Sequence, residues 1–460
     1  MLDEQRQKLY VLTRFDNSIS VIDTASRSEV QHLPMHNPEP PSVTQGRRFF
    51  YDASFSSSHG DSACASCHVF GDFDSLAWDL GNPDAFTLNI PGPFIGDPVL
   101  EPIFAPMKGP MATQSLRGMA NHGPMHWRGD RTAGNEAPSV QPDSGTFDEV
   151  AAFKKFQASF VDTLGRNGPI PDADMEAFAA YILQVTYPPN PLRNLDNSLT
   201  PDQQAGSDFF NVPVSSTLGQ SCAGCHVTDP NGNPNASAPG FFGTDGRYTF
   251  AVETQIFKVP HLRNAYQKVG MFGMSASPVL PSAYPTDHQG DQVRGFGFNN
   301  EGGIDTLFRF LAFIDFEQGS TNPDGFPQGA TGELMKRQVE EFMLVMDSNM
   351  KPIVGQQVTL RANNGAVVGP RIHLLIARAN AGDCDLVVKG YAFGREVGFL
   401  YTGGAFHPDK QEAPSLSDAS LRSVPTNGGS ELTYTCVPPG SGRRVGIDRD
   451  ADGVLDGDEL

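Results

Sequence analysis

Long apolar runs are missing from this sequence: no stretch of its 460 residues approaches the roughly 20 apolar residues that cross a bilayer. Basic residues are also few, with 33 Lys and Arg against 53 Asp and Glu, and the formal net charge is −20. This charge argues against nucleic acid and anionic membrane surfaces as partners, and it favours extracytoplasmic solubility or a basic redox protein. The length predicts roughly three domains at about 150 residues each.

Cysteine is scarce, and four of the six residues fall into two copies of one pattern. Cys64-Ala65-Ser66-Cys67-His68 and Cys222-Ala223-Gly224-Cys225-His226 both have the haem c attachment signature, in which two thiols bond the porphyrin and the next histidine ligates iron. A zinc half-site is the alternative, but neither copy is followed by further Cys or His at finger-like spacing. We therefore predict two covalently bound haem c groups. Their attachment residues and iron ligands would be Cys64, Cys67, His68, Cys222, Cys225 and His226.

The remaining cysteines, Cys384 and Cys436, lie far from both patterns. A disulfide between them, like covalent haem, indicates an oxidising compartment. Residues 1–8 contain no apolar segment of a signal peptide, so we expect the chain to begin inside a longer precursor. The expected location is the periplasm, the cell surface or the extracellular space.

Two strand-like segments, 9–14 and 18–23, are separated by turn residues and predict a β-hairpin. The hairpin resembles a β-propeller blade of the Tyr-Val-Thr-Asn type through residues 10–14 and 17–23. A single blade cannot bury both of its faces. It would therefore pack on the haem region or continue further blades upstream.

An internal repeat links the two haem patterns. Gly46-Arg47-Arg48-Phe49-Phe50 corresponds to Gly206-Ser207-Asp208-Phe209-Phe210, and Ser115-Leu116-Arg117-Gly118 corresponds to His261-Leu262-Arg263-Asn264. The first landmark, the haem pattern and the Leu-Arg landmark recur in the same order, at offsets of 160, 158 and 146 residues. This order indicates a duplicated haem domain whose loops differ in length.

Local signals make both halves mainly helical. Thr200-Pro201-Asp202-Gln203 is a capping box with proline at the first helical position, and a further helix is expected over 334–346. Two apolar stripes at helical spacing predict helices that fill the core. These stripes are Phe147, Val150, Phe153, Phe156, Phe160 and Leu164, and then Met175, Phe178 and Ile182.

From about residue 351 the pattern changes to β. Segments 357–360, 372–376, 386–388 and 431–436 are strand-like, and a disulfide between the last two cysteines would staple this small domain. The predicted fold is a mainly α haem region of two tandem cytochrome c-like domains, flanked by an N-terminal β-hairpin (a propeller blade remnant) and a C-terminal small β-domain. The predicted boundaries are 1–36 for the hairpin, 37–195 and 196–350 for the haem domains, 351–445 for the β-domain and 446–460 for a terminal loop.

The terminal loop matches the twelve-residue calcium loop. Carboxylates occupy positions 1, 3, 5, 9 and 12, glycine occupies position 6, and position 7 offers a backbone carbonyl. The corresponding ligands are Asp448, Asp450, Asp452, Val454, Asp456 and Glu459. We predict a structural calcium ion, and the alternative is an acidic solubilising tail.

The two haem patterns, the paired Leu-Arg landmarks and Trp127 together resemble the bacterial di-haem cytochrome c peroxidase superfamily, which includes the di-haem enzymes that mature tryptophan-derived quinone cofactors. The resemblance covers about residues 37–350. It implies a peroxide site at the first haem and a high-potential electron relay at the second. It also implies that Trp127, within Met125-His126-Trp127-Arg128-Gly129-Asp130-Arg131, is an electron bridge between the haems, with a purely structural tryptophan as the alternative.

The acid/base group of this superfamily is a glutamate with a nearby glutamine, which implies Glu149 and Gln141 here. Their spacing from Trp127 is longer than in the family, and Glu136 and Asp148 compete for the role. A carboxylate at the start of a helix also serves simply as a partner of the helix dipole.

The sixth iron ligands are open at this stage. Residues 69–83 hold no histidine that would close the first iron at rest, as classical members of the superfamily do. Alternative ligands beside the tryptophan are His122, Met125 and His126. For the second iron, the repeat aligns Met271 with Met125, so we favour Met271 or Met274 as a thioether ligand, with core filling as the alternative role.

The leading hypothesis is a peroxidase that receives electrons from a redox protein at the second haem and reduces hydrogen peroxide, or another small oxidant, at the first. A related alternative is the oxidative modification of a protein or small molecule at the same site. Two further alternatives are a non-enzymatic electron-transfer cytochrome and a structural or adhesive module that retains its haems as relics.

Overall fold

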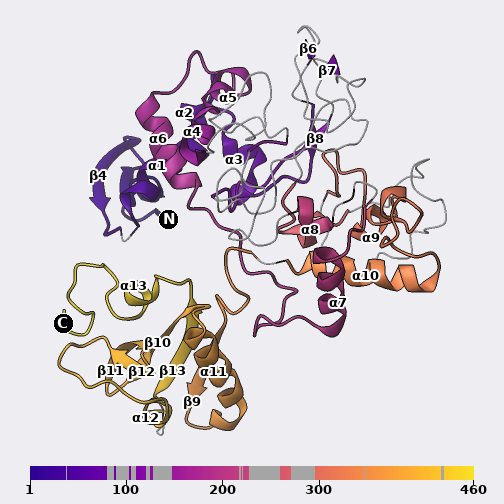
Figure 1. Ribbon diagram of the computed structural model, residues 1–460. Helices are drawn as coiled ribbons and strands as arrows, with labels where there is room; N and C mark the ends of the chain where they lie inside the picture. Colours follow the sequence, from indigo (N-terminus) through magenta and orange to yellow (C-terminus); the bar gives the residue numbers. More distant parts are fainter. Residues whose placement is uncertain are drawn as a thin grey trace. The chain divides into compact units, whose positions relative to one another are not determined.

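The structure is a computed structural model, and it describes residues 1–37, 39–79, 88–89, 103–104, 110–120, 125–127, 148–216, 219, 221–226, 260–270, 296–346, 348–425 and 429–459 (Figure 1). Two compact units share the chain. One contains Met1–Thr44, Arg193–Ser198 and Met350–Leu460, and the other contains Gln45–Leu192 and Leu199–Asn349. Within the described ranges, every helix is too short or too polar to cross a membrane.

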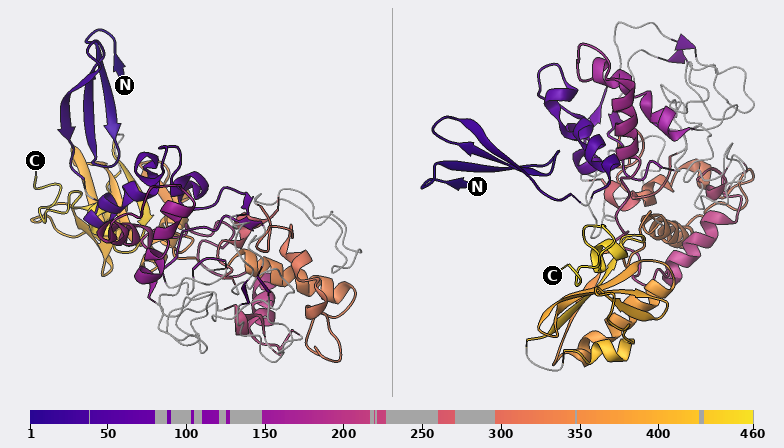
Figure 2. Two further views of the ribbon diagram at one scale, coloured as in Figure 1. Left: turned by 90° about the horizontal axis from the view of Figure 1, so that it is seen from above. Right: turned by 90° about the vertical axis from the view of Figure 1, so that its left-hand side faces the viewer.

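The N-terminal segment forms a four-stranded antiparallel sheet, visible as a twisted ribbon in Figure 2. Its strands, in spatial and chain order, are β1 (Leu2–Asp3), β2 (Lys8–Thr13), β3 (Ser18–Asp23) and β4 (Ser28–Pro34). The predicted hairpin is thus the centre of a larger sheet, with Tyr10 opposite Val21. In this segment, which is fully described up to residue 37, Val21 is the only buried apolar residue, and β4 is exposed along its whole length. The sheet therefore has almost no core of its own.

The first helical half is built on two crossing helices, α1 (Pro41–Tyr51) and α6 (Asp172–Ile182). A side chain at Gly46 would overlap the Ala177 carbonyl, so glycine permits this close approach. The remaining elements of this half are short. They are α2 (Ala53–Ser56), α3 (Cys64–Cys67), η1 (Val69–Gly71), α4 (Glu149–Lys154), α5 (Gln157–Asp162) and the two-stranded pairs β5 (Ala77–Trp78) with β8 (Met111–Ala112) and β6 (Leu88–Asn89) with β7 (Ile103–Phe104).

The second helical half repeats this arrangement with α7 (Pro201–Asn211) against α10 (Ala330–Leu344). The capping box is present as predicted, because Thr200 and Gln203 each accept from the other's backbone N–H. A side chain at Gly206 would overlap the Gln338 carbonyl. The other elements are α8 (Cys222–Cys225), η3 (Ala265–Lys268), α9 (Leu307–Phe310) and η5 (Ile314–Phe316).

The repeat landmarks have matching structural roles in the two halves. Gly46 and Gly206 both lie at a helix crossing, and Phe50 and Phe210 are both 1% exposed. The Leu-Arg landmarks end in the same backbone conformation, since φ is 61° at Gly118 and 63° at Asn264. Glycine and asparagine are the residues that adopt this left-handed region most readily. The matching positions therefore reflect one structural unit used twice.

The C-terminal domain is a five-stranded antiparallel sheet in the order β12-β11-β10-β13-β9. Its strands are β9 (Gln357–Arg361), β10 (Asp385–Ala392), β11 (Arg395–Thr402), β12 (Ala405–Pro408) and β13 (Glu431–Val437), and its helices are α11 (Gly365–Asn380), α12 (Asp418–Arg422) and α13 (Gly442–Gly446). Cys384 and Cys436 form a disulfide whose Cα atoms are 5.4 Å apart. Both cysteines belong to the core between α11 and the sheet.

One predicted strand of this domain is wrong. Residues 372–376 lie in the middle of helix α11, not in a strand. Ile372 and Leu375, three positions apart on one face of the helix, are both fully buried against the sheet. A short apolar run satisfies a strand and a buried helix equally well, and here the length of the surrounding helix decides.

Candidate functional site

The first haem pattern forms a single helical turn, α3. The Ala63 N–H donates to Ser66 Oγ at 3.1 Å, and the His68 N–H donates to the Cys64 carbonyl at 2.9 Å. This turn places both thiols on a rigid segment and puts His68 at its end. Burial raises the pKa of the Cys64 thiol to about 12. The Cys64 thiol is therefore protonated at neutral pH in the folded protein without haem.

The second haem pattern forms an equivalent turn, α8, with a different cap. Ser221 accepts from the Gly224 N–H at 3.0 Å, and the His226 N–H donates to the Cys222 carbonyl at 2.8 Å. The capping serine of this turn is Ser221, which precedes the helix, whereas the capping serine of the first turn is Ser66, which lies within it. Both patterns end with the histidine in the same place relative to its helix.

Each haem histidine is oriented by a backbone carbonyl distant in sequence. His68 Nδ1 donates to the Gln114 carbonyl at 2.8 Å, and His226 Nδ1 donates to the Pro260 carbonyl at 2.9 Å. Gln114 and Pro260 are the residues directly before the two Leu-Arg landmarks, 146 positions apart like the landmarks themselves. A histidine held at Nδ1 presents Nε2 to a metal. Burial lowers the pKa of both imidazoles, which favours the neutral, ligating form.

Trp127 lies where the two helical halves meet. The indole is 7% exposed, packs against Met111, and its Nε1–H donates to the Ala112 carbonyl at 2.7 Å. Lys268, at the end of η3 in the second half, has its Nζ 5.4 Å from the centre of the indole ring. Residue His126, before the tryptophan, has φ of 69°, a conformation that costs energy for a non-glycine residue. The tryptophan is therefore held in one orientation and touched by a cation of the other half.

A partly buried ion pair lies beside this contact. Arg117 of the first Leu-Arg landmark has Nη1 3.0 Å from Asp72 Oδ2, and its Nη2 donates to the Phe70 carbonyl at 3.1 Å. Burial raises the pKa of the Asp72 carboxyl, and Ser115, Arg117 and Lys268 act in the opposite direction. The landmark thus does two things: its preceding carbonyl orients His68, and its arginine neutralises Asp72.

Tyr187 lies next to both Leu-Arg landmarks. Tyr187 is 1% exposed, and its hydroxyl lies 3.5 Å from Nε2 of His261, the first residue of the second landmark. A side chain at Gly118 would overlap the Tyr187 ring. Burial raises the pKa of the tyrosine, so the hydroxyl keeps its proton. The sequence contained no signal for this contact because its residues are separated by more than 60 positions.

The predicted catalytic and distal residues are only partly described. Glu149 is the first residue of α4, and Asp148 is its N-cap, accepting from the Ala151 N–H at 2.9 Å. Met125 is 4% exposed and belongs to the same core cluster as Cys64. Gln141, Met271 and Met274 lie outside the described residues, as do the alternatives His122 and Glu136.

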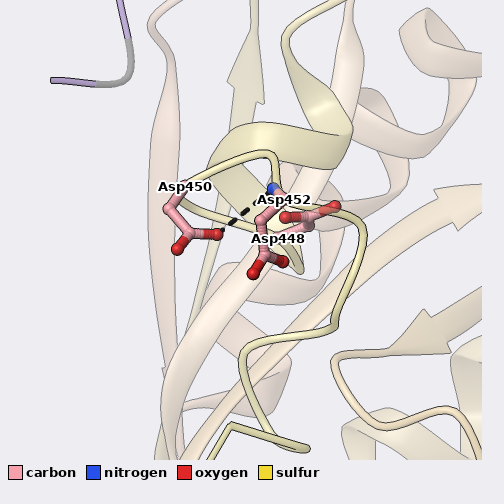
Figure 3. A group of neighbouring side chains, drawn as sticks. All are labelled: Asp448, Asp450 and Asp452. Carbon is pink, nitrogen blue, oxygen red and sulfur yellow. Dashed lines mark hydrogen bonds between the residues drawn. The ribbon is translucent and has the colours of Figure 1, made fainter. Parts of the chain in front are cut away.

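The predicted calcium ligands fall into two groups. One carboxylate oxygen from each of Asp448, Asp450 and Asp452 lies within 4.8 Å of the other two (Figure 3). Asp456 and Glu459 are not part of this cluster and pair with Lys389 and Arg449, while Asp448 within the cluster pairs with Arg443. Val454, at the position of the carbonyl ligand, is exposed.

No protein-family model matches the chain, and no curated protein matches its sequence. Hydrazine synthase of Kuenenia stuttgartiensis is similar in structure, with a TM-score of 0.37 and 19% identity over 68% of this chain and 89% of that chain. The diheme peroxidase BthA from Burkholderia thailandensis has a TM-score of 0.30 and 17% identity, over 74% and 92%. A MauG-like protein associated with microbial copper homeostasis has a TM-score of 0.33 and 14% identity, over 68% and 91%. Similarity at these TM-scores assigns no role to any residue.

Proposed function

We propose that this protein is an extracytoplasmic di-haem c oxidoreductase that reduces hydrogen peroxide, with electrons relayed from the second haem to the first. The observation that carries this proposal is the matched environment of His68 and His226. Each donates Nδ1–H to the carbonyl directly before a Leu-Arg landmark and keeps Nε2 for iron. Two histidines held alike in a duplicated unit support two iron sites of the same kind.

The residues present fit covalent haem. Cys64 and Cys67 flank one helical turn, as do Cys222 and Cys225, and the neutral histidine follows each turn. When bound, the haems supply one-electron redox chemistry and, where an iron has an open position, a site for peroxide. The chain's own contribution is to hold each imidazole in a fixed orientation and to pack the turn that precedes it against the apolar core of its helical half.

Trp127 is the proposed bridge between the two haems. Its indole is fixed by the bond to the Ala112 carbonyl and touches Lys268 of the other half. A rigid aromatic ring at the junction of the two halves supports a relay role, because electron transfer is favoured by a short, fixed path. The Lys268 ammonium over the ring also affects how readily Trp127 is oxidised, because a nearby positive charge raises the energy of the oxidised indole.

Glu149 is the proposed acid/base group for moving a proton between the oxygens of peroxide, with Gln141 as its partner. Asp148, the alternative, accepts the Ala151 N–H as the N-cap of α4. The α4–α5 segment that Glu149 begins lies beside the tryptophan segment, with the rings of His126 and Phe156 6.3 Å apart. This neighbourhood supports a role for Glu149 at the first haem.

The proposed electron donor is a basic redox protein, which the net charge of −20 favours. The disulfide between Cys384 and Cys436 supports an oxidising location in the periplasm or at the cell surface. Met271 or Met274 is the proposed thioether ligand of the second iron.

A second candidate function is electron transfer without catalysis. The buried thioether of Met125 lies in the same core cluster as Cys64, which gives the first iron a candidate sixth ligand. An iron capped in this way would carry electrons but would not bind peroxide. Oxidative modification of a protein or small molecule, the third candidate, requires the same open iron as peroxide reduction.

Low-temperature EPR of the haem-loaded protein tests the proposal, first fully oxidised and then after one-electron reduction. A high-spin ferric signal in either state is expected, because an open iron is needed for peroxide chemistry. Low-spin signals alone, two in the oxidised protein and one after one-electron reduction, would replace the peroxidase with the electron carrier. In that case Met125→Ala should convert one low-spin signal to high spin.

A further inference from the structure

The three aspartates at the start of the terminal loop share one space. Asp448 is 2% exposed, and its Oδ2 is held by Arg443 at 2.9 Å, whereas its Oδ1 is buried with no hydrogen-bond partner among the described residues. Figure 3 shows the Asp448 carboxylate facing those of Asp450 and Asp452, with one oxygen of each within 4.8 Å of the others. A buried acceptor without a donor, next to two further carboxylates, is the environment that a hard cation satisfies.

This loop is built into the β-domain. Helix α13, which leads into the loop, packs its Gly446 against Val387 of β10. Further along, the Gly457 N–H donates to the Asp409 carbonyl at 2.7 Å, and the Gln411 N–H donates to Asp458 Oδ2 at 2.7 Å. The two ends of the loop are therefore anchored before any cation binds.

The two remaining carboxylates at ligand positions of the loop, Asp456 and Glu459, contact basic groups. Asp456 is held by Lys389 Nζ at 2.9 Å and accepts from the Arg449 N–H at 2.7 Å. Glu459, the position that supplies two oxygens in a complete calcium loop, lies 3.4 Å from Arg449 Nη2. Arg449 is 63% exposed, so this pair is weak and exchangeable.

We propose that Asp448, Asp450 and Asp452 form the core of a Ca²⁺ site in which the Arg449 guanidinium competes with the cation for Glu459. In the state described here the guanidinium holds Glu459. Binding of Ca²⁺ to the three aspartates and the Val454 carbonyl draws the glutamate away and completes the oxygen shell. The inference is independent of the haem chemistry, because the site lies wholly within the C-terminal domain.

Calorimetric titration of the full-length, haem-loaded and chelator-treated protein with CaCl2 tests the site. We expect one Ca²⁺ to bind, and Asp450→Asn to weaken binding by about tenfold or more through loss of a charged ligand. An unchanged far-UV circular dichroism spectrum and an unchanged thermal unfolding curve will show that the variant is folded. Absence of Ca²⁺ binding by the unaltered protein, or equal binding by Asp450→Asn, would overturn the site.

A double-mutant cycle tests the competition. Arg449→Gln should tighten Ca²⁺ binding about two- to fivefold, the factor expected for releasing an exposed ion pair. In the Glu459→Gln background the same change should have a clearly smaller effect, because Arg449 then retains only its longer contact with Asp456 Oδ1 at 3.8 Å. Arg444→Gln removes an equal charge from α13, where Arg444 makes no ion pair in the described part of the chain, and should leave affinity unchanged. Equal tightening by Arg449→Gln with and without Glu459 would overturn the competition.

Discussion

The ammonium of Lys268 lies 5.4 Å from the centre of the Trp127 ring, so a residue of the second helical half contacts the proposed bridge in the first. A cation over an indole is attracted to the electrons of the neutral ring, and such contacts contribute roughly 1 kcal/mol. Oxidation of the ring would turn this attraction into repulsion. The lysine therefore makes Trp127 harder to oxidise.

Replacing Lys268 by methionine should speed electron transfer between the haems about fivefold, which corresponds to roughly 1 kcal/mol of barrier. Burial lowers the pKa of the lysine, and Asp72 opposes that shift. Below this lowered pKa the lysine is charged and transfer is slow; above it the lysine is neutral. The unaltered protein should therefore approach the rate of Lys268→Met as the pH rises. Stopped-flow oxidation of the second haem after peroxide addition measures both rates, and a pH-independent ratio would contradict the assignment.

Trp127→Phe should reduce peroxide turnover by about tenfold or more, equivalent to roughly 1.4 kcal/mol or more of barrier. Phenylalanine is harder to oxidise and loses the bond to the Ala112 carbonyl. The chain offers a matched control in Trp78, its only other tryptophan, which is 42% exposed and donates to Asp74 at 2.9 Å. Steady-state peroxidase assays should show normal turnover for Trp78→Phe. Equal activity of both variants would remove Trp127 from the electron path.

Arg117→Met should lower the free energy of unfolding by about 2 kcal/mol, because it removes the ion-pair partner of the largely buried Asp72 carboxylate and leaves the weaker electrostatic effect of Lys268 in place. Adding Asp72→Asn should restore part of the loss, since the uncompensated charge is then gone. The exposed pair of Arg361 and Glu431 is a suitable control, and Arg361→Met should cost about 0.5 kcal/mol or less. Denaturant unfolding measures all three. A double variant less stable than Arg117→Met alone would show that the charge is not the cause.

Gly206→Ala should destabilise the second half by about 1–3 kcal/mol, because the added methyl group meets the backbone of α10 at the Gln338 carbonyl. Gly168→Ala is the matched control, since no atom of the described residues lies within 4 Å of a side chain at that position. Thermal unfolding followed by circular dichroism compares the two. A tolerated alanine at Gly206 would mean that the helices can separate there at little cost.

Local chemistry made the short elements predictable. The box from Thr200 to Gln203 specifies a helix start through two reciprocal bonds, and the structure has them. Met175, Phe178 and Ile182 lie on the buried face of α6, as their spacing predicted. Residues 372–376 were predicted wrongly because a segment with four apolar residues among five fits either period, and only packing on a sheet assembled from distant strands selects the helix.

The contacts around the haem histidines could not be predicted in the same way. The repeat identified the Leu-Arg landmarks, but their function depends on the residue before each one, Gln114 or Pro260, and a backbone carbonyl leaves no mark in a sequence. The contact between Lys268 and Trp127 likewise leaves no pattern in the sequence, because the two residues are 141 positions apart. The net charge and the cysteine spacing predicted a di-haem redox protein. The contacts around its histidines and Trp127 depend on the tertiary structure and could not be predicted from the sequence.

The bond from each haem histidine to its carbonyl closes a segment of different length in the two halves, 46 positions from His68 to Gln114 but only 34 from His226 to Pro260. The geometry at the closing bond is nearly the same, 2.8 and 2.9 Å. The two halves thus share the hydrogen bond that orients the histidine but differ in the number of residues between the histidine and the carbonyl. Insertions and deletions between histidine and carbonyl can therefore change the segment beside each imidazole while the hydrogen bond that orients the imidazole is kept, so the two halves can diverge without either being rebuilt.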